Sequence, residues 1–348
     1  MTAYWRPIPM TDAARPDGAL TLAGGWCWFD CVERLSRTEP TRIVPLSEVP
    51  PEVLDRLTAA RTPIAGLTWD VPRIMGILNV TPDSFSDGGL FDAPAAALAQ
   101  AHAMKAGGAD LLDIGGESTR PGARELPPEE EAGRVLPILD ALRRDGSLPL
   151  SIDTRKSAVA EAALQAGADI VNDVSALGFD PRMAQVATRA RGLCLMHAQG
   201  TPETMQKDPR YADVLLDVYD HLEERLTHAE AQGIPRARIM VDPGLGFGKT
   251  LQHNVSLLRR LSLYHALGCA VLLGASRKGF IGTLSGAAEA RNRMPGSLAV
   301  ALHGAAQGVQ MIRVHDVSET RQALSLQQAL GGADPGDTTG ASTQGGTA

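Results

Sequence analysis

From Arg73 onward, apolar runs recur eight times along the chain. Each run ends in or is followed by polar residues, which we call its polar tip, and then by a helical stretch. The eight runs span residues 74–80, 110–116, 148–153, 169–175, 193–198, 238–244, 270–276 and 310–316. Strands that alternate with helices predict a parallel sheet, because a helix is the usual crossover between parallel strands. Eight such units in about 250 residues indicate an α/β fold in which the sheet closes into a (β/α)8 barrel. A doubly wound open sheet is the alternative, and the number of units favours the barrel.

The segments that flank this repeat have a different composition. Residues 1–70 are rich in proline and turn signals, and we expect an N-terminal extension that packs on a barrel of residues 71–330. The stretch "SEVPPEVLDRL" predicts one short helix within the extension. Small and polar residues fill the tail 331–348, so we expect it to be disordered.

Charge and cysteine usage exclude several classes of partner. The formal net charge of -7 argues against a nucleic-acid surface, and no apolar run is long enough to span a bilayer. The N-terminus lacks the basic-then-apolar pattern of a secretory signal. The four cysteines form no C-x-x-C pair and are typical of reduced thiols. We therefore expect a cytoplasmic protein with small-molecule substrates and with no nucleic-acid or membrane partner.

All eight predicted strands end in polar residues. In a parallel barrel these ends lie on one face, where active sites are built. The tips carry, in chain order, Asn79; Asp113, Glu117, Thr119 and Arg120; Asp153; Asn172 and Asp173; His197; Asp242; Ser276, Arg277 and Lys278; and Arg313, His315 and Asp316. One polar tip is usually a helix cap, whereas eight together indicate a site. His197 is interpreted as structural, and Asp113, Asp173 and Asp316 are candidates for bracing the loops.

The polar tips separate by chemical type. Acceptors end the third, fourth and sixth strands and suit a flat ligand with several N–H donors: Asp153, Asn172 and Asp242. Donors end the seventh and eighth strands and suit a carbonyl and an anion: Lys278, Arg313 and His315. Two loops that contain glycine and proline could close over a ligand, and they carry Asn79, Asp83, Asp87, Thr119 and Arg120. Asn79 offers a neutral oxygen that could join diphosphate oxygens around Mg²⁺.

The segment "PGLGFGKT", residues 243–250, is similar to the phosphate-binding pattern G-x-x-x-x-G-K-[ST]. Pro243 occupies the first glycine position, so the match fails by one residue. A nucleotide-hydrolysing enzyme would also leave the other seven tips without a function. We therefore do not interpret this segment as a nucleotide site.

Taken together, seven segments resemble those of the dihydropteroate synthase family and cover about residues 73–325. They are "ILNVTPDSFSDGG", "DIGGESTRPGA", "SIDT", "VNDVS", "DPGLGFGKT", "SRKGFIG" and "RVHDV". The resemblance implies a TIM barrel and an Mg²⁺-dependent transferase of folate biosynthesis. The implied reaction condenses 6-hydroxymethyl-7,8-dihydropterin diphosphate with p-aminobenzoate and releases pyrophosphate. The resemblance also implies that the protein forms a homodimer and is a target of sulfonamides.

Residue roles follow from this resemblance position by position. The pterin-binding positions are Asp153, Asn172, Asp242, Lys278 and Arg313. The positions that resemble those of the family's diphosphate pocket are Thr119, His315 and Asn79. The resemblance implies that Asn79 also holds Mg²⁺. Ser276 is a further substrate-binding position. The positions implied to act in catalysis are Asp83, Asp87, Arg120 and Lys278, and the walls around p-aminobenzoate are Phe85 and Pro121.

Two departures from the family pattern and two alternatives remain. Ala198 stands where members often have Met, and Gly279 where many have Ser, whose hydroxyl contacts the p-aminobenzoate carboxylate. The first alternative is a pterin-dependent methyltransferase on the same barrel, which has no use for two diphosphate-closing loops. The second is a non-catalytic pterin-binding paralogue, whose residues 1–70 would bind a partner.

Overall fold

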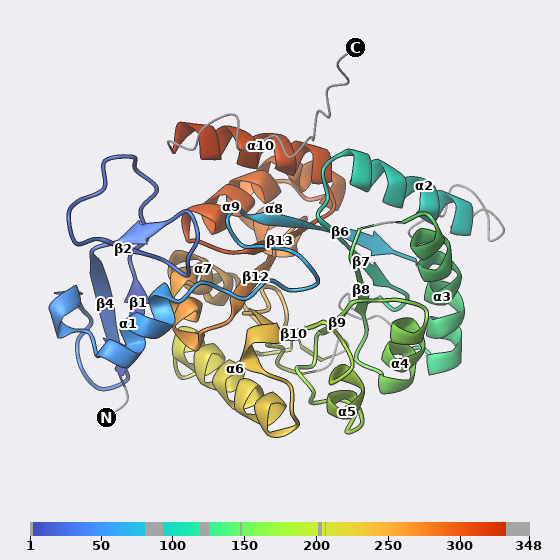
Figure 1. Ribbon diagram of the computed structural model, residues 1–348, viewed down its shortest axis with the longest axis horizontal. Helices are drawn as coiled ribbons and strands as arrows, with labels where there is room; N and C mark the ends of the chain where they lie inside the picture. The colour runs from blue at the N-terminus through green and yellow to red at the C-terminus, as the bar shows by residue number, and fades with distance from the viewer. Residues whose placement is uncertain are drawn as a thin grey trace, which may run out of the picture.

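The computed structural model describes residues 3–80, 93–118, 125–146, 148–200, 204–205 and 207–331. Eight parallel strands close a barrel, which confirms the predicted TIM fold and excludes the open sheet (Figure 1). The strands are β6 (Arg73–Asn79), β7 (Leu111–Gly115), β8 (Leu150–Asp153), β9 (Ile170–Asp173), β10 (Gly192–Met196), β11 (Ile239–Asp242), β12 (Ala270–Gly274) and β13 (Met311–Val314). Each pairs with the next in the chain, and β13 pairs with β6 to complete the ring.

Helices connect the strands and surround the barrel (Figure 1). The main ones are α2 (Ala93–Ala106), α3 (Pro128–Arg144), α4 (Ser157–Gln165), α5 (Met183–Ala187), α6 (Val214–Ala231), α7 (Leu251–Arg259), α9 (Met294–Ala306) and α10 (Val317–Leu330). A short helix, α8 (Gly279–Ser285), precedes α9 in the connection after β12. Within the described ranges, no helix combines the length and apolarity that crossing a bilayer requires.

The strands read as continuous apolar runs because helices cover their outer faces while side chains fill the interior. Every residue of β7, β10 and β12 is buried. At the amino ends of the strands, the side chains of Ile64 and Trp69 pack against Met75, Cys194 and Met240 and close the barrel. The Trp69 indole N–H donates to the Thr62 carbonyl at 2.8 Å, so this plug leaves no unpaired indole donor.

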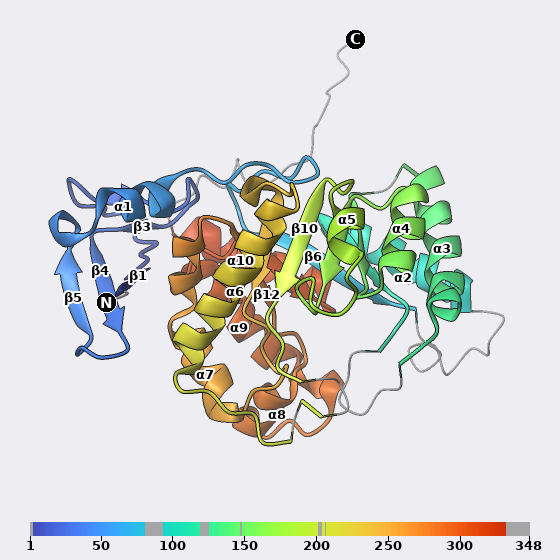
Figure 2. The same cartoon turned by 90° about the horizontal axis from the view of Figure 1, so that it is seen from below.

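The N-terminal segment forms two small antiparallel sheets and a helix beside the barrel (Figure 2). The elements are β1 (Ala3–Pro7), β4 (Cys31–Ser36) and β5 (Arg42–Pro45) in one sheet, β2 (Leu20–Thr21) and β3 (Trp28–Phe29) in the other, and α1 (Pro51–Thr58). The helix α1 confirms the one expected there.

Two contacts between this segment and the barrel involve connections that lead into strands. Arg61 donates to the His265 carbonyl at 2.9 Å, and the Trp26 indole donates to the Ala305 carbonyl at 2.9 Å. These carbonyls precede β12 and β13, so these two contacts lie toward the amino ends of the strands. Tyr4 and Arg37 also donate to Asp220 in the first turns of α6. The division at residue 70 stays a prediction, and residues 332–348 of the expected tail lie outside the described residues.

Candidate active site

Strand register places three predicted site residues in one row at the mouth of the barrel. Asn79 is in register with Gly115, Gly115 with Asp153, and Asp153 with Asn172. A Cβ built on Gly115 would lie 3.8 Å from Asn79 Oδ1 and 3.7 Å from Asp153 Oδ2. The two oxygens therefore flank the same small space, which a side chain at Gly115 would fill.

Asp113, considered only as a brace from the sequence, is the centre of a buried polar network. Its Oδ2 accepts the Asn172 Nδ2 at 2.9 Å and the Arg313 Nε at 2.6 Å. Arg313 donates a second bond from Nη2 to Asp153 Oδ2 at 2.7 Å. Asp113 is 0% exposed, and its Oδ1 has no hydrogen-bond partner within the described part of the chain. Two predicted acceptors, Asp153 and Asn172, and one predicted donor, Arg313, are thus joined through Asp113 in one network.

Burial perturbs the ionisation of Asp153 and Asp242, and neighbouring cations oppose the perturbation. It raises the pKa of Asp153 to about 7, against the nearby Arg313 charge and with a contribution from Asp113. It also raises the pKa of Asp242, and Lys278 opposes that shift. Burial disfavours the Arg313 cation, but the charges of Asp113 and Asp153 outweigh it and raise its pKa. The site therefore holds carboxylates whose charge depends on their neighbours.

Lys278 enters the site from the turn between β12 and α8. Its ammonium group donates to the Leu245 carbonyl and lies 4.5 Å from the centre of the Phe247 ring. Burial lowers the pKa of Lys278 to about 8, with Asp242 acting in the opposite direction. The sequence alone indicated no role for Phe247, although its segment is one of the seven that resemble the family.

The lookalike segment has a structural function in the described molecule. Lys249 is buried, and its ammonium contacts three acceptors: His197 Nδ1 at 2.8 Å, the Phe247 carbonyl at 3.1 Å and the His197 carbonyl at 3.4 Å. Burial lowers the pKa of His197 to about 2, so the ring is neutral and can accept this bond. Lys249 is fully engaged here and is not available to a phosphate.

Two glycines of the segment allow it to pass close to the end of β10. Gly244 and Gly248 have φ of 67° and 61°, in the left-handed region that favours glycine. A Cβ on Gly244 would lie 1.8 Å from the His197 oxygen, and one on Gly248 would lie 2.3 Å from the Gln199 oxygen. Close packing of two barrel loops therefore explains these glycines.

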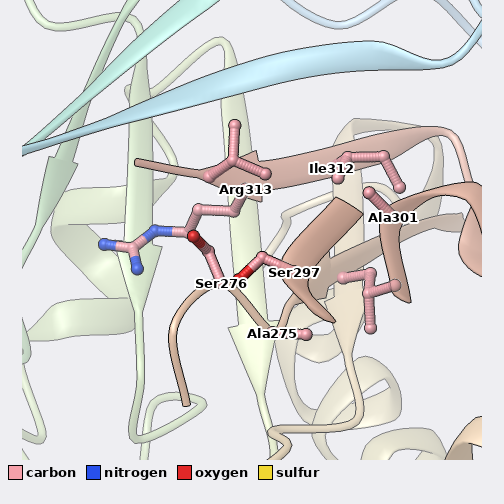
Figure 3. Close-up of a pocket in the computed structure, with 8 residues that line it drawn as sticks. Ala275, Ser276, Ser297, Ala301, Ile312 and Arg313 are labelled. Carbon is pink, nitrogen blue, oxygen red and sulfur yellow. The ribbon is translucent and has the colours of Figure 1, made fainter. Parts of the chain in front are cut away.

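Ser276 and His315 link the ends of β12 and β13. The His315 N–H donates to Ser276 Oγ at 3.2 Å, and the His315 Nδ1 lies 3.0 Å from the same oxygen. Ser276 also lines a small hollow between these strands and α9, together with Ser297 and Ala301 (Figure 3). Arg313 also lines the hollow, but its guanidinium points away from it and joins the network around Asp113 (Figure 3).

Six predicted site residues lie outside the described residues: Asp83, Phe85, Asp87, Thr119, Arg120 and Pro121. Their positions stay a prediction. Asp173 accepts bonds from the Ser175 and Leu177 N–H groups at 2.8 Å, as a loop brace does. The described residues contain no group of three His, Cys, Asp or Glu side chains that could hold a metal ion.

The sequence of residues 75–315 matches the family described as "Pterin binding enzyme". Dihydropteroate synthase from Neisseria meningitidis serogroup B is 49% identical over 268 residues, which cover 75% of this chain and 94% of that protein. The Escherichia coli enzyme of the same name is 44% identical and covers 74% of this chain and 91% of its own length. The chain belongs to the dihydropteroate synthase family. It is therefore a pterin-binding transferase that catalyses the dihydropteroate synthase reaction.

Solved dihydropteroate synthase structures agree with this assignment. The Xanthomonas albilineans enzyme with 4-aminobenzoic acid superposes with a TM-score of 0.74 at 46% identity, covering 79% of this chain and 99% of that one. The same organism's enzyme in complex with 7,8-dihydropteroate gives a TM-score of 0.72 at 43% identity, covering 79% of this chain and 100% of that one. These matches set aside the methyltransferase alternative.

Proposed function

We propose that the tip residues of this dihydropteroate synthase bind the dihydropterin diphosphate and transfer its methylene carbon to p-aminobenzoate. The observation that carries the proposal is the network around Asp113. Through it, Asn172, Asp153 and Arg313 are held in fixed positions at the barrel mouth. Preorganised polar groups of this kind can orient a flat heterocycle without reorganising during the reaction.

Pterin recognition requires acceptors for the 2-amino group and the ring N–H groups. Asp153, Asn172 and Asp242 supply them from three strands. Asp242 Oδ1 already accepts the Gly244 N–H at 2.7 Å, which leaves Oδ2 for the ligand. Arg313 has two of its nitrogens engaged by carboxylates, and the flat face of its guanidinium can stack on the ring.

Lys278 serves the carbonyl side of the pterin. Its ammonium can donate to the ring carbonyl, and a pKa of about 8 keeps the group mostly charged near neutral pH. The adjacent Phe247 ring gives an apolar wall beside that donor. Together with Phe85 and Pro121, it would line the pocket of the second substrate, p-aminobenzoate.

Departure of pyrophosphate requires groups that bind its charge. Asn79, Ser276 and His315 lie on the diphosphate side, and Thr119, Arg120, Asp83 and Asp87 would join them from the loops. Asn79 gives one neutral oxygen next to Asp153, which fits an Mg²⁺ ion that takes most of its ligands from substrate and water. When bound, the ion would neutralise charge on the leaving group.

The chemical step breaks the bond between the methylene carbon and the diphosphate oxygen, which departs with the electron pair. The positive charge left on the methylene and pterin is favoured by the ionised Asp153 and Asp242. The aromatic amine then attacks the carbon and releases a proton, and no strong base is required. Closing loops would keep water from capturing the cation first.

Three further properties rest on the resemblance to relatives. The Yersinia pestis enzyme has been solved in a sulfonamide drug complex and is 43% identical to this chain. We infer that this protein is likewise a sulfonamide target. A homodimer and a cytoplasmic location complete the proposal.

The test measures dihydropteroate formed from the pterin diphosphate and radiolabelled p-aminobenzoate, with and without Mg²⁺. Wild type is compared with Asp153→Ala, with Lys278→Ala and with a control, Asp169→Ala. Asp169 pairs with Arg143 near the amino end of β9, far from the tips. We expect Mg²⁺-dependent product that is largely lost in the two site variants and retained by the folded control. Folded wild type that binds pterin without forming product would instead support the non-catalytic paralogue.

A further inference from the structure

Arg277 has an unusual backbone conformation between two site residues. Its φ is 58°, in the left-handed region, where the Cβ of an ordinary residue is crowded. Ser276 precedes it, and Lys278 follows it at the start of α8. Such conformations persist where the surroundings determine them, and they cluster at functional sites.

The two backbone polar groups of Arg277 are bound by side chains from the connection after β12. Its N–H donates to Ser297 Oγ at 2.9 Å, and its carbonyl accepts from Arg293 Nη1 at 3.0 Å. Ser297 lies beside Ser276 at the hollow behind the strand ends (Figure 3). Both peptide groups that flank the strained Cα are therefore fixed.

The Arg277 side chain pairs with Asp316, which follows β13. The guanidinium donates from Nε to Asp316 Oδ2 at 3.0 Å and from Nη2 to Oδ1, so the pair is bidentate. Bidentate pairs of arginine and carboxylate fix geometry as well as contribute energy. This pair ties the turn after β12 to the turn after β13.

Asp316 pairs with Arg277 and does not cap the helix that begins after it. It is the N-cap residue of α10, and aspartate is among the preferred residues at that position. Within the described chain, its side chain makes no capping hydrogen bond to the helix. The carboxylate is directed at Arg277 instead, so the pair, and not the helix end, accounts for its identity.

We propose that Arg277 and Asp316 are a positioning pair that holds the Ser276–Lys278 turn so that the Lys278 ammonium reaches the pterin site. The inference rests on the proposed function of Lys278 as the donor to the pterin carbonyl. Arg277 is a positioning residue and not a catalytic one. It acts through the backbone turn, in which the side chain of the left-handed residue pairs with Asp316 while the side chain of its neighbour contacts Leu245 and Phe247.

A double-mutant cycle tests the pair: kcat and KM for the pterin diphosphate are measured for wild type, Arg277→Ala, Lys278→Ala and the double variant. We expect Arg277→Ala to lower kcat/KM by about 10- to 100-fold, because a misplacement of about 1 Å can cost that much. In the Lys278→Ala background the same change should cost less than about threefold, because the group it positions is absent. Asp316→Asn should reproduce the Arg277→Ala loss, and Arg277→Lys should restore part of it.

An arginine–aspartate pair at the opposite end of the barrel serves as a control that distinguishes a positioning function from a purely structural one. Arg321 pairs with Asp110 there, and Arg321→Ala should leave kcat/KM of the folded enzyme unchanged. Melting temperatures of all variants record the structural cost. Equilibrium binding of 7,8-dihydropteroate supplies a second cycle that does not depend on turnover.

Two outcomes would overturn the inference. One is an Arg277→Ala loss that is equally large with and without Lys278. The other is an unchanged kcat/KM in Arg277→Ala, which would leave the pair a brace like that of Arg321. A Lys278→Ala variant with wild-type activity would instead refute the proposed function of Lys278, so the two failures are distinguishable.

Discussion

The two ends of the barrel are built from the same eight strands, yet they bury opposite kinds of side chain. At the amino end, Trp69 and Ile64 pack on apolar residues. At the carboxyl end, Asp113, Asp153 and Arg313 are drawn together out of water. Burying charges costs free energy that their mutual attraction only partly returns, whereas burying an indole is favourable. The amino end therefore stabilises the fold, and the carboxyl end uses part of that stability for chemistry.

The largest effect should come from removing the centre of the charged network. Asp113→Ala leaves Arg313 with one carboxylate fewer and Asn172 without its partner. We expect a loss of about 3–5 kcal/mol in the free energy of unfolding, as for other broken buried pairs, and loss of nearly all activity. Urea unfolding and kcat/KM measure the two effects. Retention of both would contradict the central position of Asp113.

Trp69→Ala tests the other end of the comparison. The fully packed indole should cost about 3–5 kcal/mol of unfolding free energy when it is truncated. The polar tips are not touched, so kcat/KM of the folded enzyme should stay near the wild-type value. Thermal unfolding with activity measured well below the transition separates the two quantities. A large loss of kcat/KM in folded protein would show that the two ends are coupled.

The pH dependence of activity should report the buried charges of the carboxyl end. Activity needs ionised Asp153 and protonated Lys278, whose pKa values are about 7 and about 8. The kcat/KM profile should therefore rise toward pH 7 and fall above pH 8, by about tenfold per pH unit on each limb. Asp153→Asn should remove the acidic limb from the residual activity, and Trp69→Ala should leave the profile unchanged. A flat wild-type profile from pH 6 to 9 would refute this assignment.

The raised pKa of Asp153 also determines how the free energy of unfolding changes with pH. Because the folded state raises its pKa from 3.8 to about 7, the folded protein binds the proton more tightly than the unfolded chain does. This group therefore contributes less stability as pH rises from about 4 to about 7. Asp153→Asn should flatten that part of the curve of unfolding free energy against pH, which urea titrations at each pH would measure.

The smallest effect concerns Gly279, at the first position of α8. A Cβ built there has no described neighbouring atom within 4 Å, so a side chain fits without a clash. Gly279→Ser should lower the KM for p-aminobenzoate about fivefold, which corresponds to one hydrogen bond of about 1 kcal/mol. The KM for the pterin and the unfolding free energy should change little. Gly133→Ser, in a similarly open position on α3, is the control.

Much of the fold could be predicted because its signals are local. Each apolar run is followed at once by its polar residues, and each of the eight predicted runs overlaps a barrel strand, with β6 and β10 beginning one residue before the run. The tips could be assigned to one face because parallel strands end on the same side. The functions of Asp113 and Lys249 could not be predicted. In the sequence, an aspartate or lysine that organises a buried network looks the same as one that braces a loop or binds a ligand.

The strand count, the closed barrel and the family follow from the amino-acid sequence alone, because each depends on short segments in a given order. Which charged side chains pair with one another depends on the tertiary structure. Asp113 and Arg313 are 200 residues apart and come within hydrogen-bond distance only when the barrel closes. Exclusion of water at that point strengthens their attraction and shifts the pKa of Asp153, so the electrostatics of the site are a property of the closed barrel and of no single segment.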